Sequence, residues 1–459
     1  MIRLAIVVQV LAVPTLAFAG GFYVPEIGAR ATAMGAAVVA LPTDPAAVFH
    51  NPAGLAGQQA AAAVGLNLFF PRIEFFRRPV DDPSTGERVF FEGTDNENFV
   101  LPAPWLGGVW PASDDLAVGL AVYAPFGAAI EYPEDGSQRH IVQAVDLKVI
   151  HVSPAVAYRI ADWLSVGLAA HYVHGSLVLD QANAVAHVTG DPEAFPDPES
   201  GMEGSNHLEA SDPFSIGATL GVLLRPSERF AIGVSVMSPV SLRLEGDARI
   251  TNGAITALQD ADGNELQPVG RRTDAFSAEI PLPLIARLGV AVRPIDSVAI
   301  EADVNWQRWS TFERLVVDFE NEWELLPTPG ANLYDVVAEN DWSDSFSARL
   351  GAEATPFDEP YRVRAGALWD QSPIDEEHFD VLAPDSDKLG FGGGVGYSLR
   401  VGAGRWLDVD LSYLHLFLAE RKVYRTERTI LNKQASSFYR GTTRASFDAV
   451  GLQLGVRFD

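Results

Sequence analysis

The sequence lacks three features that would point to other classes of protein. It has no cysteine, so neither disulfide bonds nor cysteine-ligated metals can hold the fold together. No segment approaches the roughly 18 to 20 uninterrupted apolar residues of a membrane-spanning helix, which excludes a helical membrane protein. Lys and Arg number only 33 against 60 Asp and Glu, for a net charge of −27. This excess of negative charge argues against nucleic acid as a partner.

Motifs for catalysis are also scarce. The nine histidines are scattered, and neither HExxH nor GxSxG occurs. The glycine-rich run 391–396 (FGGGVG) is not a phosphate loop, because no Lys-Ser or Lys-Thr follows it. His171 is expected inside the protein and His174 near an outer rim, which leaves open a barrel enzyme acting on lipids. The sequence otherwise predicts no enzyme, no catalytic residue, no metal and no cofactor.

What the sequence does have is a high apolar content without long apolar runs. Hydrophobic residues make up 47% of the chain, with 40 glycines and 10% aromatics. Residues 1–19 carry Arg3, an apolar run from Leu4 to Leu16 and the small-residue ending Ala17-Phe18-Ala19, which predicts a secretory signal peptide. An exported chain with many apolar residues and no membrane helix is typical of a transmembrane β-barrel, whose apolar residues alternate with polar ones.

The pattern beyond residue 60 predicts fourteen strands. They are 60–76, 100–111, 114–126, 141–160, 163–180, 209–225, 229–246, 275–293, 297–318, 342–356, 361–370, 388–400, 405–424 and 440–458. Short connections of a few residues alternate with long ones, among them 371–387. An even number of strands with short turns at one end and long loops at the other is typical of bacterial outer-membrane barrels. The prediction is therefore an all-β, 14-stranded antiparallel transmembrane β-barrel over residues 60–459.

Side-chain alternation assigns the two faces of this wall. In 229–237, Phe230, Ile232, Val234 and Val236 fall on one face and are predicted to contact lipid. Residues 390, 392, 394 and 396 are glycines on one face, so the wall there leaves interior space that something must fill. Aromatic residues near the strand ends predict two girdles at the membrane surfaces. They are Trp110, Trp163, Tyr361 and Trp406 at the short turns, and Trp306, Trp309, Trp342 and Trp369 at the other end.

Residues 20–59 differ from the rest of the chain. They show no sustained period of two, are rich in Gly and Ala, and carry only Glu26, Arg30 and Asp44 as charges. A compact, mostly apolar segment of this kind predicts a plug inside the barrel, an N-terminal hatch. Asn51 precedes Pro52 and can form an Asx-turn with local backbone.

Two runs in this segment carry a resemblance to a known family. They are GFYVPEIGARATAMGAA (21–37) and DPAAVFHNPAGLAG (44–57), the latter with Asn51, Pro52 and Ala53. The segment resembles the hatch of FadL-type outer-membrane transporters, and similarity extends to 282–294, 306–315 and 364–397. The resemblance implies passive uptake of long-chain fatty acids or other hydrophobic compounds across the bacterial outer membrane. It also implies that the Asn-Pro-Ala sequence serves gating and that Phe22 and Val24 reach toward a ligand.

The third strand carries a second expectation. Pro125 cannot donate to a strand ladder and Gly127 permits a bend, so Pro125, Phe126 and Gly127 mark either the end of the strand or a kink. FadL-type proteins have a kinked third strand with a lateral opening, and the resemblance favours the kink.

Charged residues are expected on the inner face, where pairing with one another or with the plug is the first interpretation. Arg287, Arg349 and Arg364 are also candidates for holding a substrate carboxylate. The expected partners are hydrophobic small molecules, outer-membrane lipids and the barrel assembly machinery, which reads a terminal aromatic such as Phe458. The protein is expected to be a monomer. The alternatives are the lipid-modifying barrel enzyme and a structural or adhesin barrel.

Overall fold

The computed structural model describes residues 21–81, 86–97, 100–184, 203–251, 271–321, 323–324, 332–333, 336–356, 360–402, 404–424, 429–430, 433–434 and 439–458. The predicted signal peptide, residues 1–19, lies outside these ranges and stays a prediction.

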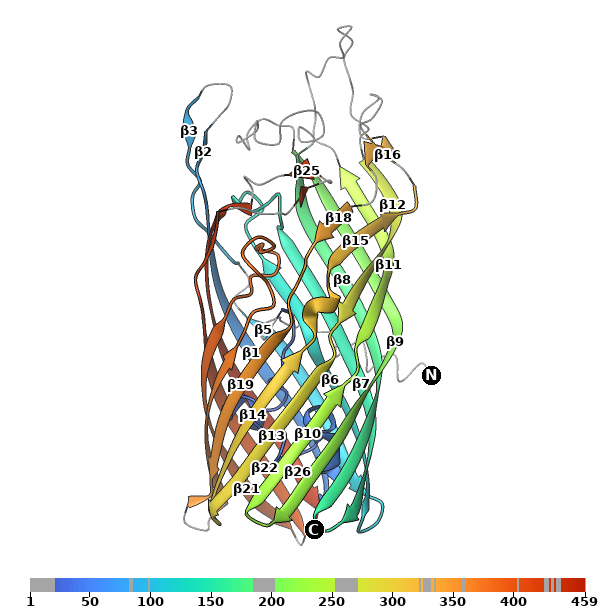
Figure 1. Ribbon diagram of the computed structural model, residues 1–459, viewed down its shortest axis with the longest axis vertical. Coiled ribbons are helices and arrows are strands. Elements are labelled where there is room, and N and C mark those ends of the chain that lie inside the picture. Colours follow the sequence, from blue (N-terminus) through green and yellow to red (C-terminus); the bar gives the residue numbers. More distant parts are fainter. Residues whose placement is uncertain are drawn as a thin grey trace.

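The chain forms one antiparallel sheet that closes into a barrel (Figure 1). Strand β1 (Ala60–Arg77) pairs with β26 (Gly441–Phe458) from Ala60 opposite Phe458 to Arg77 opposite Gly441. Closure leaves no free sheet edge at this seam, which allows strands to lie in a bilayer without unpaired backbone groups. Among the described residues, no helix is long and apolar enough to cross a membrane.

The fourteen predicted strands are confirmed. After β1 they are β5 (Leu101–Pro111), β6 (Leu116–Glu131), β7 (Ala144–Ala161), β8 (Leu164–Ala184), β9 (Glu203–Ser227), β10 (Phe230–Met237) with β11 (Val240–Thr251), β12 (Arg271–Leu282) with β13 (Ile285–Ile295), β14 (Val298–Gln307) with β15 (Arg314–Phe319), β18 (Val336–Glu339) with β19 (Ser345–Ala354), β20 (Tyr361–Asp370), β21 (Lys388–Gly402), β22 (Arg405–Leu418) with β23 (Arg421–Val423), and β26. The short strands β2 (Val80–Asp81), β3 (Arg88–Val89), β4 (Thr94–Asp95), β16 (Trp323–Glu324), β17 (Asn332–Leu333), β24 (Thr429–Ile430) and β25 (Lys433–Gln434) belong to the long connections.

Several wall strands are interrupted where the sequence predicts one continuous strand. Pro239 separates β10 from β11, and Pro283 separates β12 from β13. A proline cannot donate to the ladder, so it ends one stretch of pairing before the next begins. Between β14 and β15 the chain forms a short turn, η3 (Trp309–Thr311). Some residues beside these breaks turn away from the wall and into the interior of the barrel.

The lipid-facing and inward-facing positions alternate as predicted. In β10, Phe230, Val234 and Val236 are exposed while Ala231 and Ser235 are buried. Trp110 and Trp163 at the short turns are exposed, as the girdle prediction requires. The prediction is wrong for Trp309 and Trp342, which are buried inside the barrel. The breaks beside β15 and β19 turn these two residues inward, which the strand pattern alone does not indicate.

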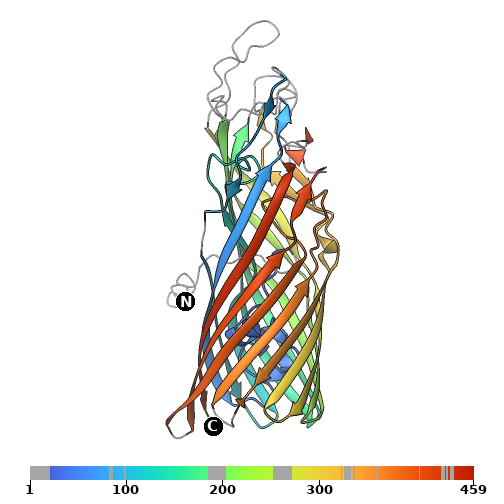
Figure 2. The ribbon, with the colours of Figure 1, turned by 90° about the vertical axis from the view of Figure 1, so that its left-hand side faces the viewer.

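Residues 21–59, named here the hatch segment, lie inside the barrel near its short-turn end (Figure 2). They form α2 (Ala29–Ala33), α3 (Ala47–His50) and η1 (Pro52–Leu55). Helix α2 fills the space beside the glycines of β21, where a Cβ on Gly392 would lie 2.7 Å from the Thr32 carbonyl oxygen. The interior room that the glycine row predicts is therefore occupied by this segment.

Two buried carboxylates of β14 fix the middle of the hatch segment through its backbone. Asp303 accepts hydrogen bonds from the amides of Val38 and Val39 at 2.9 and 3.1 Å. Glu301 accepts from the amides of Ala40 and Leu41 at 2.5 and 3.1 Å. Four consecutive backbone amides thus find acceptors on the wall, which satisfies donors that would be costly to bury unpaired. We call this contact the carboxylate latch.

Candidate functional site: a cavity above the hatch segment

The third strand, β6, separates from its neighbour β5 partway along its length. Strands β5 and β6 pair only from Pro111 opposite Ala117 to Leu106 opposite Val122. Beyond Val122, β6 keeps its pairing with β7, with a register shift between Tyr123 and Phe126, and residues 124–130 are buried on both faces. The strand therefore continues past Pro125 to Glu131, and the alternative that it ends at residue 126 is wrong. We call the place where β5 and β6 part the wall break.

The other side of the wall break is the free edge of β5. Residues 101–105 of β5 pair with β1 on one side, and the β5–β6 ladder does not reach them. The hatch segment approaches β6 here instead. Tyr23 forms an isolated antiparallel bridge with Phe126, the Val24 amide donates to the Pro125 carbonyl at 2.7 Å, and the Gly127 amide donates to the Phe22 carbonyl at 3.0 Å.

Phe22 sits in a cluster of aromatic rings, which we call the aromatic floor. Its ring centroid lies 4.9 Å from Trp309, 5.9 Å from Trp342, 6.2 Å from Phe126 and 6.3 Å from Phe312. These distances and the mostly edge-on angles fall within the favourable range for aromatic pairs. Phe22 is thus held by interior residues of the strand breaks and by the kinked strand at the same time.

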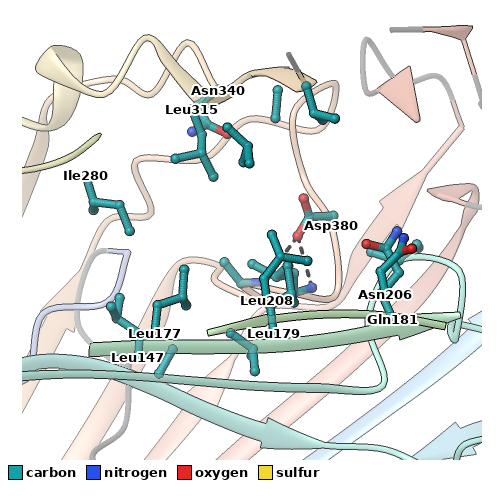
Figure 3. A pocket seen from close by; sticks show the side chains of 18 of the residues that line it. Leu147, Leu177, Leu179, Gln181, Asn206, Leu208, Ile280, Leu315, Asn340 and Asp380 are labelled. Atoms are coloured by element: carbon teal, nitrogen blue, oxygen red, sulfur yellow. Dashed lines mark hydrogen bonds between the residues drawn. The ribbon is translucent and has the colours of Figure 1, made fainter. Parts of the chain in front are cut away.

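Above this floor lies an apolar cavity of about 260 Å³ (Figure 3). Phe22 lines its base, and apolar side chains from strands on both sides make most of its wall. For scale, an engineered apolar cavity of about 150 Å³ binds benzene. Leu147, Leu177, Leu179, Leu208, Ile280 and Leu315 are among the lining residues. Such a space accepts a hydrophobic molecule larger than a single benzene ring.

An inward-folded loop closes one side of the cavity. Residues 371–387, which the sequence identifies only as a long connection, place Ile374, Phe379 and Val381 in the interior. Asp385 in this loop forms an ion pair with Lys388 and accepts from the Gly21 amide at 3.1 Å. The loop therefore contacts the start of the hatch segment as well as the cavity.

Asn51 joins the hatch segment to the wall, and its predicted Asx-turn is present. The Ala53 amide donates to Asn51 Oδ1 at 3.2 Å. Asn51 Nδ2 donates to the carbonyls of Val39 at 2.9 Å and Val222 at 3.1 Å. Asn51 is completely buried, and Pro52 and Ala53 are buried beside it. The Asn-Pro-Ala sequence thus lies at the attachment of the hatch segment, below the cavity.

The three candidate arginines lie around the hatch segment, and none lines the cavity. Arg349 pairs with Asp370 at 3.0 Å and lies 3.8 Å from Glu26, and Arg364 pairs with Glu353 and Asp410, both at 2.6 Å. Arg287 donates to the Tyr23 hydroxyl at 2.8 Å and to Ser235. The expected pairing of inner charges with one another and with the plug is confirmed. That one of them holds a substrate carboxylate stays a prediction.

Burial changes the protonation of two groups in the hatch segment. It raises the pKa of the Glu26 carboxyl to about 7, an effect that Arg349 partly opposes. It lowers the pKa of the His50 imidazole to about 3, so this ring stays neutral and can bond to the Ile27 carbonyl, 3.0 Å from its Nε2.

His171 has a serine partner but not the geometry of a hydrolase. Its Nδ1 lies 2.8 Å from Ser153 Oγ, and its Nε2 lies 2.7 Å from Thr219 Oγ1. A serine hydrolase orients its histidine with a carboxylate and exposes the serine to substrate. Here the third group is a hydroxyl, and Ser153 is fully buried. Among the described residues, no cluster of three or more His, Asp or Glu side chains could hold a metal ion.

Sequence reasoning finds Phe22 and the kinked strand but misses most of what surrounds them. Trp309, Phe312 and Trp342 belong to the aromatic floor, yet the sequence assigns Trp309 and Trp342 to a membrane girdle and gives Phe312 no role. The available signal is the density of aromatics in WQRWSTFERL (306–315), which exceeds what a lipid-facing strand end requires. The inner loop gives no such signal.

Comparison with known proteins agrees with this architecture. The sequence model of the family described as outer membrane protein transport protein (OMPP1/FadL/TodX) matches residues 10–458. An outer membrane protein of Neisseria meningitidis is 27% identical over 95% of this chain and 94% of its own. The long-chain fatty acid transport protein of Escherichia coli O6:H1 is 23% identical over 90% of each. The crystal structure of a Pseudomonas aeruginosa FadL homologue superposes with a TM-score of 0.77 at 18% identity, covering 96% of this chain and 100% of that one. The chain belongs to the OmpP1/FadL/TodX family of outer-membrane transport proteins.

Proposed function

We propose that this outer-membrane protein is a passive route for hydrophobic molecules, which enter the cavity from the long-loop side and leave sideways through the wall break. Hydrophobic molecules cross a polar surface layer poorly, whereas an apolar cavity in a barrel shields them from water. The observation that carries the proposal is the contact of Phe22, Tyr23 and Val24 with the kinked strand β6 at the floor of that cavity.

The route has two steps. A ligand in the cavity touches Phe22, and Phe22 to Val24 cover the inner side of the wall break through two backbone hydrogen bonds and one bridge. Displacement of this short segment opens a path from the cavity to the break. Opening this path requires breaking those backbone contacts and shifting the Phe22 ring against its aromatic neighbours.

The proposal includes no energy source and no catalysis. The relatives in this family are transport proteins, and the surroundings of His171 do not support a hydrolase. The family name and the apolar cavity support fatty acids or other hydrophobic compounds as the transported class. Outer-membrane lipid is the medium that receives the ligand at the wall break. Recognition of Phe458 by the assembly machinery and a monomeric state are part of the same proposal.

The test straightens the third strand. Pro125→Val with Gly127→Val restores a backbone donor and removes a flexible position, which favours pairing of β6 with β5. We expect uptake of a hydrophobic fluorescent compound to slow in cells with matched outer-membrane levels, while the barrel's heat resistance on gels is kept. A matched control is Pro111→Val, at the short-turn end of β5 away from the break. Uptake at the parental rate in the double variant contradicts lateral release.

A further inference from the structure

The cavity has a polar end on the side away from Phe22. Strands β8 and β9 pair in the order Leu177 with Ala210, Leu179 with Leu208, and Gln181 with Asn206, going toward the long loops. Five of these six residues line the cavity: Leu177, Leu179, Gln181, Asn206 and Leu208. Four residues of strand cover roughly 13 Å. The lining therefore changes from apolar pairs to a pair of side-chain amides over the length of a small molecule.

The two amides at this end each present a carbonyl oxygen as an acceptor. Gln181 Nε2 already donates to the His140 carbonyl at 2.7 Å, which leaves its Oε1 for another group. Asn206 Oδ1 is buried and has no hydrogen-bond partner among the described residues. Figure 3 shows Gln181 and Asn206 together at one end of the cavity, with Leu147 and Leu177 at the other.

A carboxylate adds a third acceptor. Asp380 of the inner loop lines the same cavity, and Figure 3 shows it between the amide pair and the residues of the opposite wall. One of its oxygens accepts from the amides of Leu382 at 3.0 Å and Ala383 at 3.2 Å. These two bonds fix the carboxylate in place, so it does not depend on a ligand for its orientation.

We infer that the cavity selects hydrophobic molecules bearing a hydroxyl group, such as phenols and alcohols, with the hydroxyl at Gln181 and Asn206 and the apolar body toward Phe22. A hydroxyl donates to an acceptor that is otherwise buried without a partner, and a plain hydrocarbon leaves that acceptor unsatisfied. Sites built to bond a substrate hydroxyl discriminate strongly against analogues that lack it. The inference rests on the proposed function, because it assigns a class of molecule to the same cavity.

A carboxylate ligand fits this end less well than a hydroxyl. A carboxylate has no proton to donate to Asn206 Oδ1, and it would lie in the same cavity as the like-charged Asp380. Arg349 and Arg364 are engaged in ion pairs around the hatch segment. Arg287 bonds to Tyr23 and lines no part of the cavity.

The experiment compares three ligands with one apolar body and different heads: 4-ethylphenol, ethylbenzene and 4-ethylbenzoate. Binding to the purified full-length protein at pH 7.5 is followed by tryptophan fluorescence, since Trp342 lines the cavity. We expect 4-ethylphenol to bind about tenfold more tightly than either other ligand, the effect of one or two added hydrogen bonds.

Variants of the lining residues test how the ligand's head group and its apolar body each contribute to binding. Gln181→Leu with Asn206→Leu should weaken 4-ethylphenol about tenfold and leave ethylbenzene unchanged, since the leucines keep the volume and remove the acceptors. Asp380→Asn should strengthen 4-ethylbenzoate. Gln143→Leu, which removes an amide whose hydrogen bond is exposed and which lies outside the cavity, is the matched control. Heat resistance on gels verifies that each variant is folded.

The outcomes distinguish a failure of this inference from a failure of the proposed function on which it rests. Equal affinity of the parent protein for 4-ethylphenol and 4-ethylbenzoate overturns the head-group assignment while the cavity keeps its role. The same holds if the double leucine variant loses ethylbenzene and 4-ethylphenol alike. If none of the three ligands binds, the proposed function fails and this inference fails with it.

Discussion

Tyr23 of the hatch segment and Phe126 of the kinked strand form a β-bridge, although 103 positions of sequence separate them. Phe22, the neighbour of Tyr23, lines the cavity, so a single short stretch touches both the bound ligand and the wall. Displacing Phe22 therefore strains the bridge at Phe126. Phe22, Tyr23 and Phe126 therefore connect the cavity to the wall break.

The first prediction concerns the aromatic floor. Phe22→Ala removes the aromatic ring that lines the base of the cavity. A ring contact is worth about 0.5–1.5 kcal/mol beyond burial, so we expect hydrophobic ligands to bind up to about tenfold more weakly. Equilibrium binding to the purified protein measures this. Phe76→Ala, at an exposed position of β1, should change nothing. Equal affinities in all three proteins would show that Phe22 only fills space.

The second prediction concerns Asn51. Asn51→Ala deletes three hydrogen bonds. Two of them satisfy buried backbone groups, the Val39 carbonyl and the Ala53 amide, and each such group costs about 1–3 kcal/mol if it is left unsatisfied. We expect faster hydrogen exchange in the hatch segment and altered uptake, with the barrel still assembled. Thr43→Ala, at an exposed position of the same segment, is the control. Unchanged exchange in Asn51→Ala contradicts a role for this residue in holding the segment.

The third prediction concerns two prolines of β5. In an antiparallel strand, alternate residues direct their N–H groups to opposite neighbours. Pro102 and Pro104 keep a regular ladder with β1, so their missing donors face the wall break. The free edge of β5 therefore offers fewer donors to β6 than an ordinary strand does.

Restoring those donors should narrow the break. We expect Pro102→Val with Pro104→Val to slow uptake severalfold and to protect amides of β5 and β6 from exchange. Pro71→Val in β1, whose strand pairs with β26 throughout and lies on the far side of β5 from the break, serves for comparison. If exchange and uptake both match the parent, the two prolines do not hold the break open.

The fourth prediction is a pH dependence of the hatch segment. Because burial raises the pKa of Glu26 to about 7 from about 4.3 in an unfolded chain, the docked segment binds the proton more tightly than the free one. The stabilising effect is complete below pH 4 and is lost as the pH rises through 7. We expect the segment to be more accessible to protease at pH 8 than at pH 5. Glu26→Gln should abolish the difference, and its persistence in that variant would rule Glu26 out as the cause.

The barrel could be predicted from the sequence because the patterns that indicate its strands are local. Alternation in β10 and the lengths of successive connections depend on neighbours in the chain, so the strand number and the two faces follow from them. The hatch segment could be predicted for the opposite reason, since residues 20–59 lack the alternation of the strands and are mostly small or apolar. Phe22 and Pro125 could be singled out in this way, one beside the start of the segment and one inside a strand.

The rest depends on contacts between distant parts of the chain. Trp309 and Trp342 face inward because the wall is interrupted between β14 and β15 and between β18 and β19, and no neighbour in sequence shows the direction in which the chain turns there. Leu382 and Asp380 reach the cavity because a loop folds back over residues far from it in sequence. The register of β8 against β9, which places Gln181 opposite Asn206, follows from the closure of the whole barrel.

The carboxylate latch has an evolutionary consequence. Glu301 and Asp303 bind backbone amides and no side chain of residues 38–41, so the contact is indifferent to which amino acids occupy those positions, provided that none is proline. The hydrogen bonds of the latch therefore place no demand on these side chains, and what restricts them is the packing of Val38, Val39, Ala40 and Leu41, which are all buried. The two acids on β14 are restricted by the latch itself, because each serves two amides at once.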